Sequence, residues 1–291
     1  GSGMRRVAVD ILSMRALDAF DDFFTELYDA CEAMDIPADT AISEAGLGQF
    51  EINLMHQHNA LKAADDAWLF KMLVKGMARK HGFAASFMAK PYADYAGSGL
   101  HMHFSMLDAD GKNVFDDGTE AGSDLLRHAI HGCLQAMPGS TLIFAPHANS
   151  YARFVPGAHA PTGIAWAYEN RTAAIRVPSG PAPARRIEHR LAGGDVNPYL
   201  SIAAVLGAAL TGVEDATDPP TPITGNAYTQ DLPQVPGSGA AAIDTFETCP
   251  RTARIFDAEL IRNLVMTKRQ EAREMAGLSA DEQTEIYLDT V

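Results

Sequence analysis

The stretch from residue 99 to residue 106 reads Gly99-Leu100-His101-Met102-His103-Phe104-Ser105-Met106. Apolar and polar side chains alternate along it, as they do in a β-strand whose two faces meet different surroundings. In such a strand His101, His103 and Ser105 share one face, and the apolar side chains share the other. The stretch therefore predicts a strand with one face in the core and one face that carries imidazoles and a hydroxyl.

Two further segments, 49–54 and 185–191, show the same alternation. Their polar faces hold Gln49, Glu51 and Asn53 in the first segment and Arg186, Glu188 and Arg190 in the second, where Ile187, His189 and Leu191 lie opposite. Alternation by itself also fits the solvated face of an ordinary antiparallel sheet, and this alternative stays open for each strand taken separately. Carboxylates and imidazoles ligate divalent cations, however, and guanidinium groups bind phosphates and carboxylates. Taken together, the three segments indicate an ion-binding surface.

The spacing of apolar residues predicts several helices in the N-terminal half. Ser13 is expected to cap a helix that ends before Pro37. Another helix is expected over 60–81, with Trp68 and Met72 facing inward together with Met77, and with Gly82 at the C-terminal cap. A further helix is expected over 123–137.

The C-terminal half begins with a helix start at Asn197-Pro198 that leads into an Ala-rich, closely packed helix. Residues 215–240 are rich in Pro and Gly and predict a long surface loop within the domain. Helices are expected near 252–276 and, from a capping box at Ser279 and Glu282, over 280–289. Mixed strands and helices in this order predict an α+β fold.

The bulk composition excludes several classes of protein. The 291 residues carry 23 basic and 37 acidic side chains, a net charge of −14, which disfavours nucleic acid or an anionic membrane as a partner. Three scattered cysteines indicate neither a disulfide framework nor a metal site, and a reducing cytoplasm is the expected location. Residues 1–4, Gly-Ser-Gly-Met, resemble the remnant of an expression tag.

Several motifs, in one order along nearly the whole chain, resemble those of the glutamine synthetase family. The segment Lys90-Pro91-Tyr92, followed by Ala96-Gly97-Ser98-Gly99-Leu100-His101 and Ser105, is similar to the family's ATP-binding motif. Further similar segments are Glu44 to Glu51, Asn149 to Arg153, Glu169 to Arg176, Arg185 to Arg190 and Asn197 to Leu200. The sequences of residues 160–162, 168–176 and 287–291 are most similar to the branch that contains γ-glutamylpolyamine synthetases.

The resemblance implies a fold. Residues 5–291 would form part of the family's catalytic domain, a curved antiparallel sheet with helices covering its outer face. The strands that carry Glu51, His101 and Glu188 would be neighbours in one sheet, with these side chains on a common concave face.

The resemblance also implies a role for individual residues in an ATP-dependent ligase that uses Mg²⁺ or Mn²⁺. Glu44 and Glu51 would hold one metal ion, and His101 and Glu188 a second. ATP would contact His103, Ser105, Arg176 and Arg186. Glutamate would be bound by Arg153 and by the carbonyl of Gly97, while Arg171 and Arg190 would steady the transferred phosphoryl group. The alternatives are surface ion pairs for the arginines and hydrogen-bonded core imidazoles for the histidines.

Two positions depart from the pattern of glutamine-forming members. His159 stands where those members have a glutamate that takes a proton from ammonium, and Ala96 stands where they usually have Asn. A histidine can act as general base on an amine but supplies less negative charge to attract a cation. The departures favour glutamate and an amine larger than ammonia as substrates, with His159 as a catalytic residue.

No Glu-x-Glu pair precedes Glu44, although family catalytic domains begin with one. We therefore expect that the chain is a part of a longer, ring-forming homo-oligomeric parent and that by itself it has little activity. Two alternatives stay open, an ordinary glutamine synthetase that uses ammonium and a non-catalytic family member that serves as a binding or assembly module. The sequence leaves open which amine is used and whether Tyr228 is modified, as in some bacterial relatives.

Overall fold

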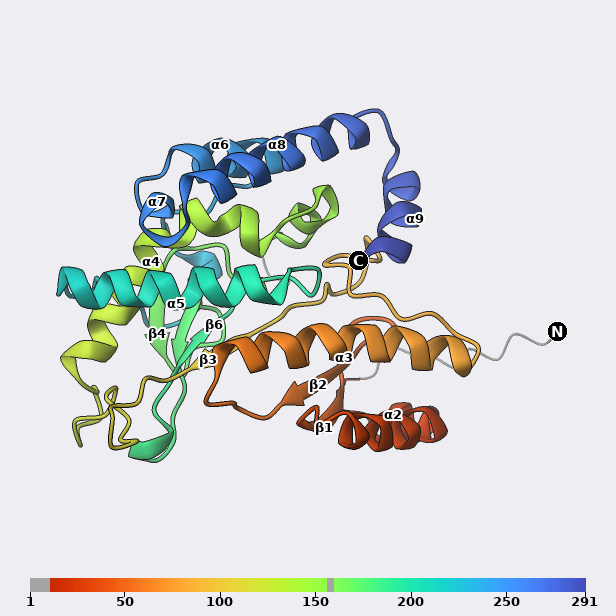
Figure 1. The fold of residues 1–291 in the computed structure, drawn as a ribbon, viewed down its shortest axis with the longest axis horizontal. Coiled ribbons are helices and arrows are strands. Elements are labelled where there is room, and N and C mark those ends of the chain that lie inside the picture. The colour runs from red at the N-terminus through yellow and green to blue at the C-terminus, as the bar shows by residue number, and fades with distance from the viewer. Residues whose placement is uncertain (1–10, 156–159) are drawn as a thin grey trace.

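The computed structural model describes residues 11–155 and 160–291. These residues form two open sheets with helices packed around them (Figure 1), so the α+β class is confirmed. The smaller sheet is a hairpin of β1 (Ala38–Ser43) and β2 (Phe50–Leu54), and the larger sheet has four strands. Each sheet has a hydrophobic core of its own.

The hairpin packs with three helices, α1 (Met14–Asp18), α2 (Asp21–Ala33) and α3 (Ala60–Lys80). Ser13 caps the first of them as predicted, because its hydroxyl accepts a hydrogen bond from the amide of Ala16 at 3.3 Å. The expected single helix is nevertheless broken between α1 and α2. Phe20 leaves helical geometry there, and its ring meets the rings of Phe50 and Phe83 at 5.3 and 5.4 Å. Burial of an aromatic ring accounts for the break.

The prediction that Trp68 and Met72 face inward is wrong. Their side chains are 44% and 56% exposed, whereas Phe70 of the same helix is buried in the core under the hairpin and Met77 packs against that core. Helix α3 carries apolar residues on more than one face, so the period of the sequence fits two orientations. Contacts with α2 and with the hairpin select the face that is buried.

The larger sheet has the strand order β3-β6-β5-β4. Its strands are β3 (Met102–Phe104), β4 (Trp166–Tyr168), β5 (Ile175–Val177) and β6 (Ile187–His189). Strand β6 pairs antiparallel with β3 and with β5, but β4 and β5 are parallel. The alternation predicted for residues 99–106 and 185–191 is confirmed, although only three residues of each segment form regular strand.

The expectation of one antiparallel sheet bearing Glu51, His101 and Glu188 is wrong in two respects. Strand β2, which carries Glu51, pairs with β1 in a separate sheet, and the larger sheet contains one parallel pair. Pairing between distant strands depends on the path of the intervening chain, and alternation within a segment carries no information about it.

Helices α4 (Asp124–Phe144) and α5 (Pro198–Asp215) cover the larger sheet and cross closely (Figure 1). A Cβ atom at Gly132 would lie 2.0 Å from the carbonyl oxygen of Ala208, and one at Gly212 would lie 2.1 Å from that of His128. Only glycine fits at either position, which confirms the expected close packing of α5. Helix α4 runs past its predicted end at residue 137, through Pro138, to Phe144.

The Pro/Gly-rich segment after α5 is a loop, as predicted, with a single short turn of 3₁₀ helix, η3 (Ala227–Thr229). Four helices follow it, namely α6 (Gly239–Thr248), α7 (Thr252–Ile255), α8 (Ala258–Met275) and α9 (Ala280–Thr290). Helix α6 was not predicted, whereas the capping box of Ser279 and Glu282 at the start of α9 is confirmed. Within the described residues, no helix combines the length and apolar character that crossing a membrane requires.

Acid should destabilise the fold through His189, whose ring is buried against Phe144 with a centroid distance of 4.5 Å. Burial lowers its pKa to about 3. Because the folded pKa lies below the unfolded value of about 6.5, this contribution to stability is present above pH 6.5 and is lost as the pH falls. When the pH is lowered from 7 to 5.5, the free energy of unfolding of His189→Phe should fall by about 1 kcal/mol less than that of the unsubstituted chain. Urea unfolding measures this, with His58→Phe as an exposed control; equal losses would contradict the prediction.

Candidate active site

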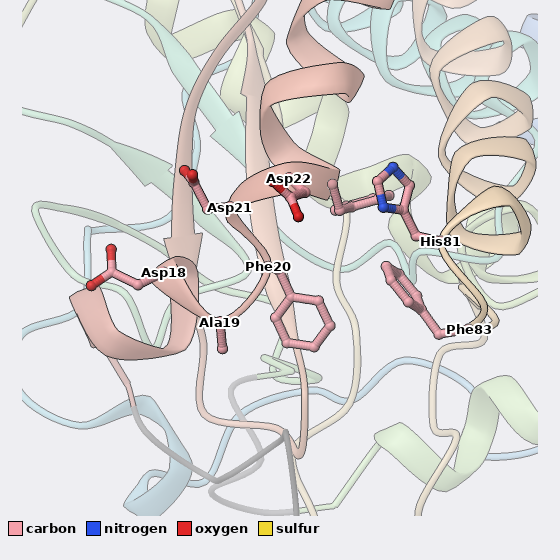
Figure 2. Close-up of a pocket in the computed structure, with 8 residues that line it drawn as sticks. Asp18, Ala19, Phe20, Asp21, Asp22, His81 and Phe83 are labelled. Atoms are coloured by element: carbon pink, nitrogen blue, oxygen red, sulfur yellow. The ribbon is translucent and has the colours of Figure 1, made fainter.

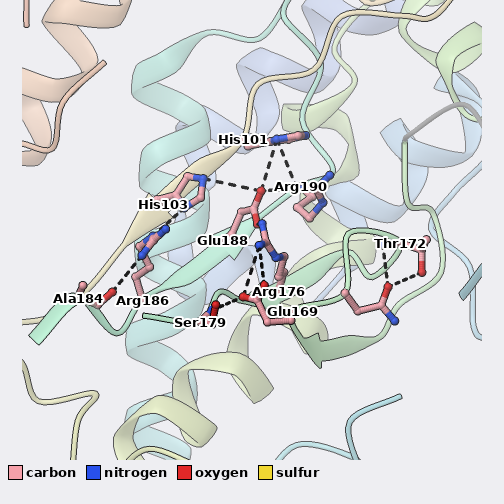
Figure 3. A network of polar contacts seen from close by, with 11 residues as sticks. His101, His103, Glu169, Thr172, Arg176, Ser179, Ala184, Arg186, Glu188 and Arg190 are labelled. Atoms are coloured by element: carbon pink, nitrogen blue, oxygen red, sulfur yellow. Dashed lines mark hydrogen bonds and ion pairs between the residues drawn. The ribbon is translucent and has the colours of Figure 1, made fainter. Parts of the chain in front are cut away.

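The carboxylate of Glu188 is the centre of the polar face of the larger sheet (Figure 3). The side chain is only 2% exposed. It accepts hydrogen bonds from Arg190 and, at 2.8 Å, from Nη1 of Arg176. Nδ1 of His101 and Nε2 of His103 lie 3.5 and 3.7 Å from its Oε1. Two guanidinium groups and two imidazoles thus converge on one buried carboxylate.

Strand register explains this convergence. His103 on β3 and Arg176 on β5 both pair with Glu188 on β6, so the three side chains form a row across the sheet. Side chains of directly opposite residues project to the same face. Arg190, two residues beyond Glu188, lies on that face because strand side chains alternate.

Burial lowers the pKa values of His101 and His103, and neighbouring guanidinium groups lower them further. The charge of Glu188 acts in the opposite direction on His103 but does not reverse the shift. Both imidazoles are therefore neutral at pH 7, and each has one nitrogen that can accept a hydrogen bond. In His103 this nitrogen is Nδ1, which accepts from Nε of Arg186 at 3.1 Å.

The glycine-rich segment before β3 lies against Arg153, which ends the 3₁₀ helix η1 (Ala148–Arg153). A Cβ atom at Gly97 would lie 2.3 Å from the carbonyl oxygen of Ala89 and 3.1 Å from Cγ of Arg153. One at Gly99 would lie 2.8 Å from Nη2 of Arg153 and 3.4 Å from Nε2 of His101. These glycines therefore bring the backbone close to Arg153, which joins the two motifs in space.

Gln49 connects the smaller sheet to this segment. Its Nε2 donates to the carbonyl of Gly97 at 2.9 Å and lies 3.3 Å from the hydroxyl of Ser98, while its Oε1 accepts from the amide of Gly46 at 2.8 Å. The carbonyl of Gly97 is the group expected to accept from glutamate, and its second lone pair remains available. Gln49 had no predicted role, although its place on the polar face beside Glu51 was a signal.

Glu44 and Glu51 face the same region from the hairpin. Burial raises the pKa of Glu51, and the negative charge of Glu44 raises it further, while Arg171 and Arg190 act in the opposite direction. Glu51 therefore shares its surroundings with the face around Glu188, although its strand belongs to the other sheet. Within residues 11–155 and 160–291, no three His, Cys, Asp or Glu side chains are close enough together to hold a metal ion.

The turn after β4 presents Arg171 at its exposed tip. Glu169 has a left-handed backbone with φ 52°, and its carboxylate accepts from the amide of Ser179 and pairs with Arg176 at 3.3 Å. Thr172 donates to the side chain of Asn170 at 2.7 Å and accepts from the amide of Ala227 at 2.9 Å, which fixes the turn to the Pro-rich loop. Glu169 is a second residue of the site that the sequence analysis left without a role.

The remaining predicted residues differ in their placement. Ser105 is exposed and directly follows β3, while Arg185 pairs with Asp116 at 3.4 Å, as expected for a structural ion pair. His159 lies outside the described residues. The hydroxyl of Tyr228 is shielded from solvent, and whether this residue is modified stays untested.

A separate pocket of about 340 Å³ lies between the start of α2 and the end of α3 (Figure 2). Its lining combines the carboxylates of Asp18, Asp21 and Asp22 with the rings of Phe20, Phe23, His81 and Phe83. None of the predicted site residues is among them, so the pocket does not belong to the candidate site.

Comparison with known proteins agrees with this geometry. A family model described as the catalytic domain of glutamine synthetase matches residues 2–287. The chain belongs to the glutamine synthetase family. Solved structures of apo GmaS without ligand and of a GmaS/ADP complex are 30% and 29% identical, with TM-scores of 0.85 and 0.86. They cover 97% and 99% of this chain, which covers 66% and 68% of theirs.

The names of two relatives of the chain each contain a particular amine joined to a γ-glutamyl group. The chain is 42% identical over 231 residues to gamma-glutamylputrescine synthetase of Escherichia coli, and 39% identical over 226 residues to gamma-glutamylethanolamide synthetase of Streptomyces coelicolor. It is 33% identical over 282 residues to glutamine synthetase of Halobacterium salinarum. The matches span 49%, 48% and 62% of these relatives' own lengths.

Removing the charge of Glu188 should destabilise the domain. Glu188→Gln leaves Arg176 and Arg190 without their shared buried counter-charge, which should cost roughly 3 kcal/mol. Glu169→Gln is the matched control, because Glu169 is 48% exposed in its pair with Arg176 and should cost less than about 1 kcal/mol. Urea unfolding in the presence of a chelator measures both. Equal losses for the two variants would show that Glu188 is not the centre of the network.

Proposed function

We propose that the protein is an ATP-dependent ligase that forms a γ-glutamyl amide from glutamate and an amine larger than ammonia. The observation that carries the proposal is the state of Arg153. Its side chain is 2% exposed and donates to the carbonyl of Leu191 at 2.7 Å. Among the described residues no carboxylate contacts its guanidinium group directly, and the charge of the buried Asp195 acts on it only from a longer distance. A buried guanidinium group without a carboxylate partner is costly unless a ligand supplies the anion.

Glutamate fits the groups around Arg153. The guanidinium group would bind the α-carboxylate in a forked geometry, and the carbonyl of Gly97 would accept from the α-amino group. Gln49 holds that carbonyl in place through the 2.9 Å hydrogen bond. The γ-carboxylate would then extend toward Arg190 and Arg171, which are cationic and would attract the phosphoryl group.

ATP would bind along the other edge of the same face, at Arg176, Arg186, His103 and Ser105. Carboxylates and a neutral imidazole are ligands that Mg²⁺ or Mn²⁺ accepts. Burial and the charge of Glu44 raise the pKa of Glu51, so a bound cation would stabilise its ionised form. We propose that Glu44 and Glu51 hold one ion and that His101 and Glu188 hold another. Such ions, when bound, would neutralise charge on the phosphates.

The proposed reaction has two steps. An oxygen of the glutamate γ-carboxylate bonds to the γ-phosphorus of ATP, and ADP leaves. The amine nitrogen then bonds to the acyl carbon of γ-glutamyl phosphate, phosphate leaves, and the nitrogen loses a proton to a base. We propose His159 as that base from the sequence motif. Arg171 and Arg190 stabilise the phosphoryl charge in both steps.

Two alternatives have less support. An ordinary glutamine synthetase would be expected to attract ammonium with a carboxylate, and His159 stands at that position. A non-catalytic module would not need to retain Glu44, Glu51, His101 and Glu188. We also propose, from the resemblance alone, that the protein assembles as a ring-forming homo-oligomer.

The test measures ADP release that depends on glutamate and an amine, with saturating Mg²⁺ or Mn²⁺. The amines are ammonium, methylamine, ethanolamine and putrescine. We expect turnover of about 1 s⁻¹ or more in the protein that contains this chain, with kcat/KM highest for an amine other than ammonium. The 291 residues alone should bind nucleotide weakly and turn over much more slowly, because too few metal ligands converge among residues 11–155 and 160–291. A preference for ammonium would establish the ordinary glutamine synthetase, and absence of glutamate-dependent ADP release with every amine would refute the ligase.

The substitution His159→Glu tests the choice of amine. A fixed carboxylate attracts a small cation and accepts its proton, so kcat/KM for ammonium should rise relative to that for the best amine. Loss of one preorganised electrostatic group can lower kcat by roughly 10² to 10³. We therefore expect the ratio of kcat/KM for ammonium to that for the best amine to rise by at least about tenfold. His159→Gln is the uncharged control. An unchanged ratio would show that His159 does not set the choice.

A further inference from the structure

Three side chains from distant parts of the sequence meet at the start of η1, the short helix that ends at Arg153. His147 precedes η1, Glu271 lies on α8, and Tyr287 lies on α9. Nδ1 of His147 is 2.8 Å from Oε1 of Glu271, and the hydroxyl of Tyr287 donates to the same oxygen at 2.9 Å. We call these three residues the C-terminal cluster. Its members are brought together by the fold alone, since 124 positions separate His147 from Glu271.

Glu271 also has a partner outside the cluster. Lys268 donates to the second carboxylate oxygen of Glu271 at 2.7 Å. Burial acts to raise the pKa of Glu271, but the hydrogen bonds from His147 and Lys268 outweigh it and lower the pKa to about 2. The carboxylate therefore remains ionised, and its hydrogen bonds to His147 and Tyr287 are charge-assisted.

The cluster is bonded directly to the start of η1. The hydroxyl of Tyr287 accepts from the amide of Ala148, the first residue of η1, at 3.3 Å. The backbone amide of His147 donates to the hydroxyl of Ser150 at 2.9 Å, and that hydroxyl donates to the buried carboxylate of Asp195. Since η1 has only six residues and ends at Arg153, the hydrogen bond at Ala148 lies within two helical turns of Arg153.

The C-terminal helices also make apolar contacts that are separate from these polar ones. The ring of Tyr287 packs with Met88, Met275 and Val291 in a small apolar core of its own. Helix α8 packs separately against α6. Removing one hydroxyl from Tyr287 leaves these apolar contacts intact, so its hydrogen bonds have an effect that can be tested apart from the fold.

We propose that Tyr287 and Glu271 are positioning residues that act through His147 and η1 to hold Arg153 in place for the α-carboxylate of glutamate. The inference deepens the proposed function and, for the identity of the ligand, rests on it. It assigns the last two helices of the chain a role in substrate affinity, although they lie outside the face around Glu188.

The first experiment observes Arg153 without any ligand. The Nε–H cross-peak of Arg153 in a ¹H–¹⁵N spectrum is identified by its loss in Arg153→Lys. We expect Tyr287→Phe and Glu271→Gln to shift or broaden this peak. Tyr199→Phe is the matched control, because it removes a hydroxyl that bonds to the exposed Asp65 on a different part of the surface. An unshifted peak in both test variants would overturn the inference, whatever the activity.

The second experiment measures the consequence for glutamate. In Tyr287→Phe the KM for glutamate should rise about fivefold, the change expected for one net hydrogen bond. The kcat value and the KM for ATP should stay within about twofold, and Tyr199→Phe should change none of them. A shifted Arg153 peak with an unchanged KM for glutamate would also overturn the inference. If the unsubstituted protein neither binds nor uses glutamate, the proposed function fails, and the cross-peak still decides whether the cluster positions Arg153.

Discussion

The buried carboxylate of Glu188 is the interaction on which the rest of the candidate site depends. It balances Arg176 and Arg190, whose positive charges would otherwise repel each other on one face of the sheet. Its position on the middle of three paired strands also brings His101 and His103 to the same place. A site that must attract phosphate needs several guanidinium groups, and a shared counter-ion allows them to be held close together before a ligand arrives.

Arg153 is positioned without a direct ion pair to any described residue. Its guanidinium group has no carboxylate partner among the described residues, so it is positioned by packing against glycine backbone and by a hydrogen bond to a carbonyl. The two kinds of arginine correspond to the two proposed ligands. Those around Glu188 contact a carboxylate directly and suit a highly charged phosphate, whereas Arg153 has no carboxylate of the described residues in direct contact and suits a single carboxylate ligand. Gln49 connects the hairpin that carries Glu44 and Glu51 to the glycine segment beside Arg153.

Much of the site could be predicted from the sequence, because its residues lie in short motifs. Alternation placed Glu188 and Arg190 on one face and His189 on the other, as the structure shows. The roles of Gln49 and Glu169 could not be predicted in this way. Each acts through one contact with a distant segment, Gly97 and Ser179, and nothing in its own neighbourhood indicates that partner.

The sequence by itself determined the elements whose causes are local. Helix caps at Ser13, Asn197 and Ser279, the polar faces of the short strands and the loop after α5 depend on hydrogen bonds and periodicity within a few residues. Tertiary structure alone decided that the strands form two sheets, that α3 buries Phe70 and exposes Trp68, and that Tyr287 reaches the start of η1. In each of these cases the local pattern allowed more than one arrangement. The choice among them came from the burial of apolar surface and the pairing of polar groups between segments far apart in the chain.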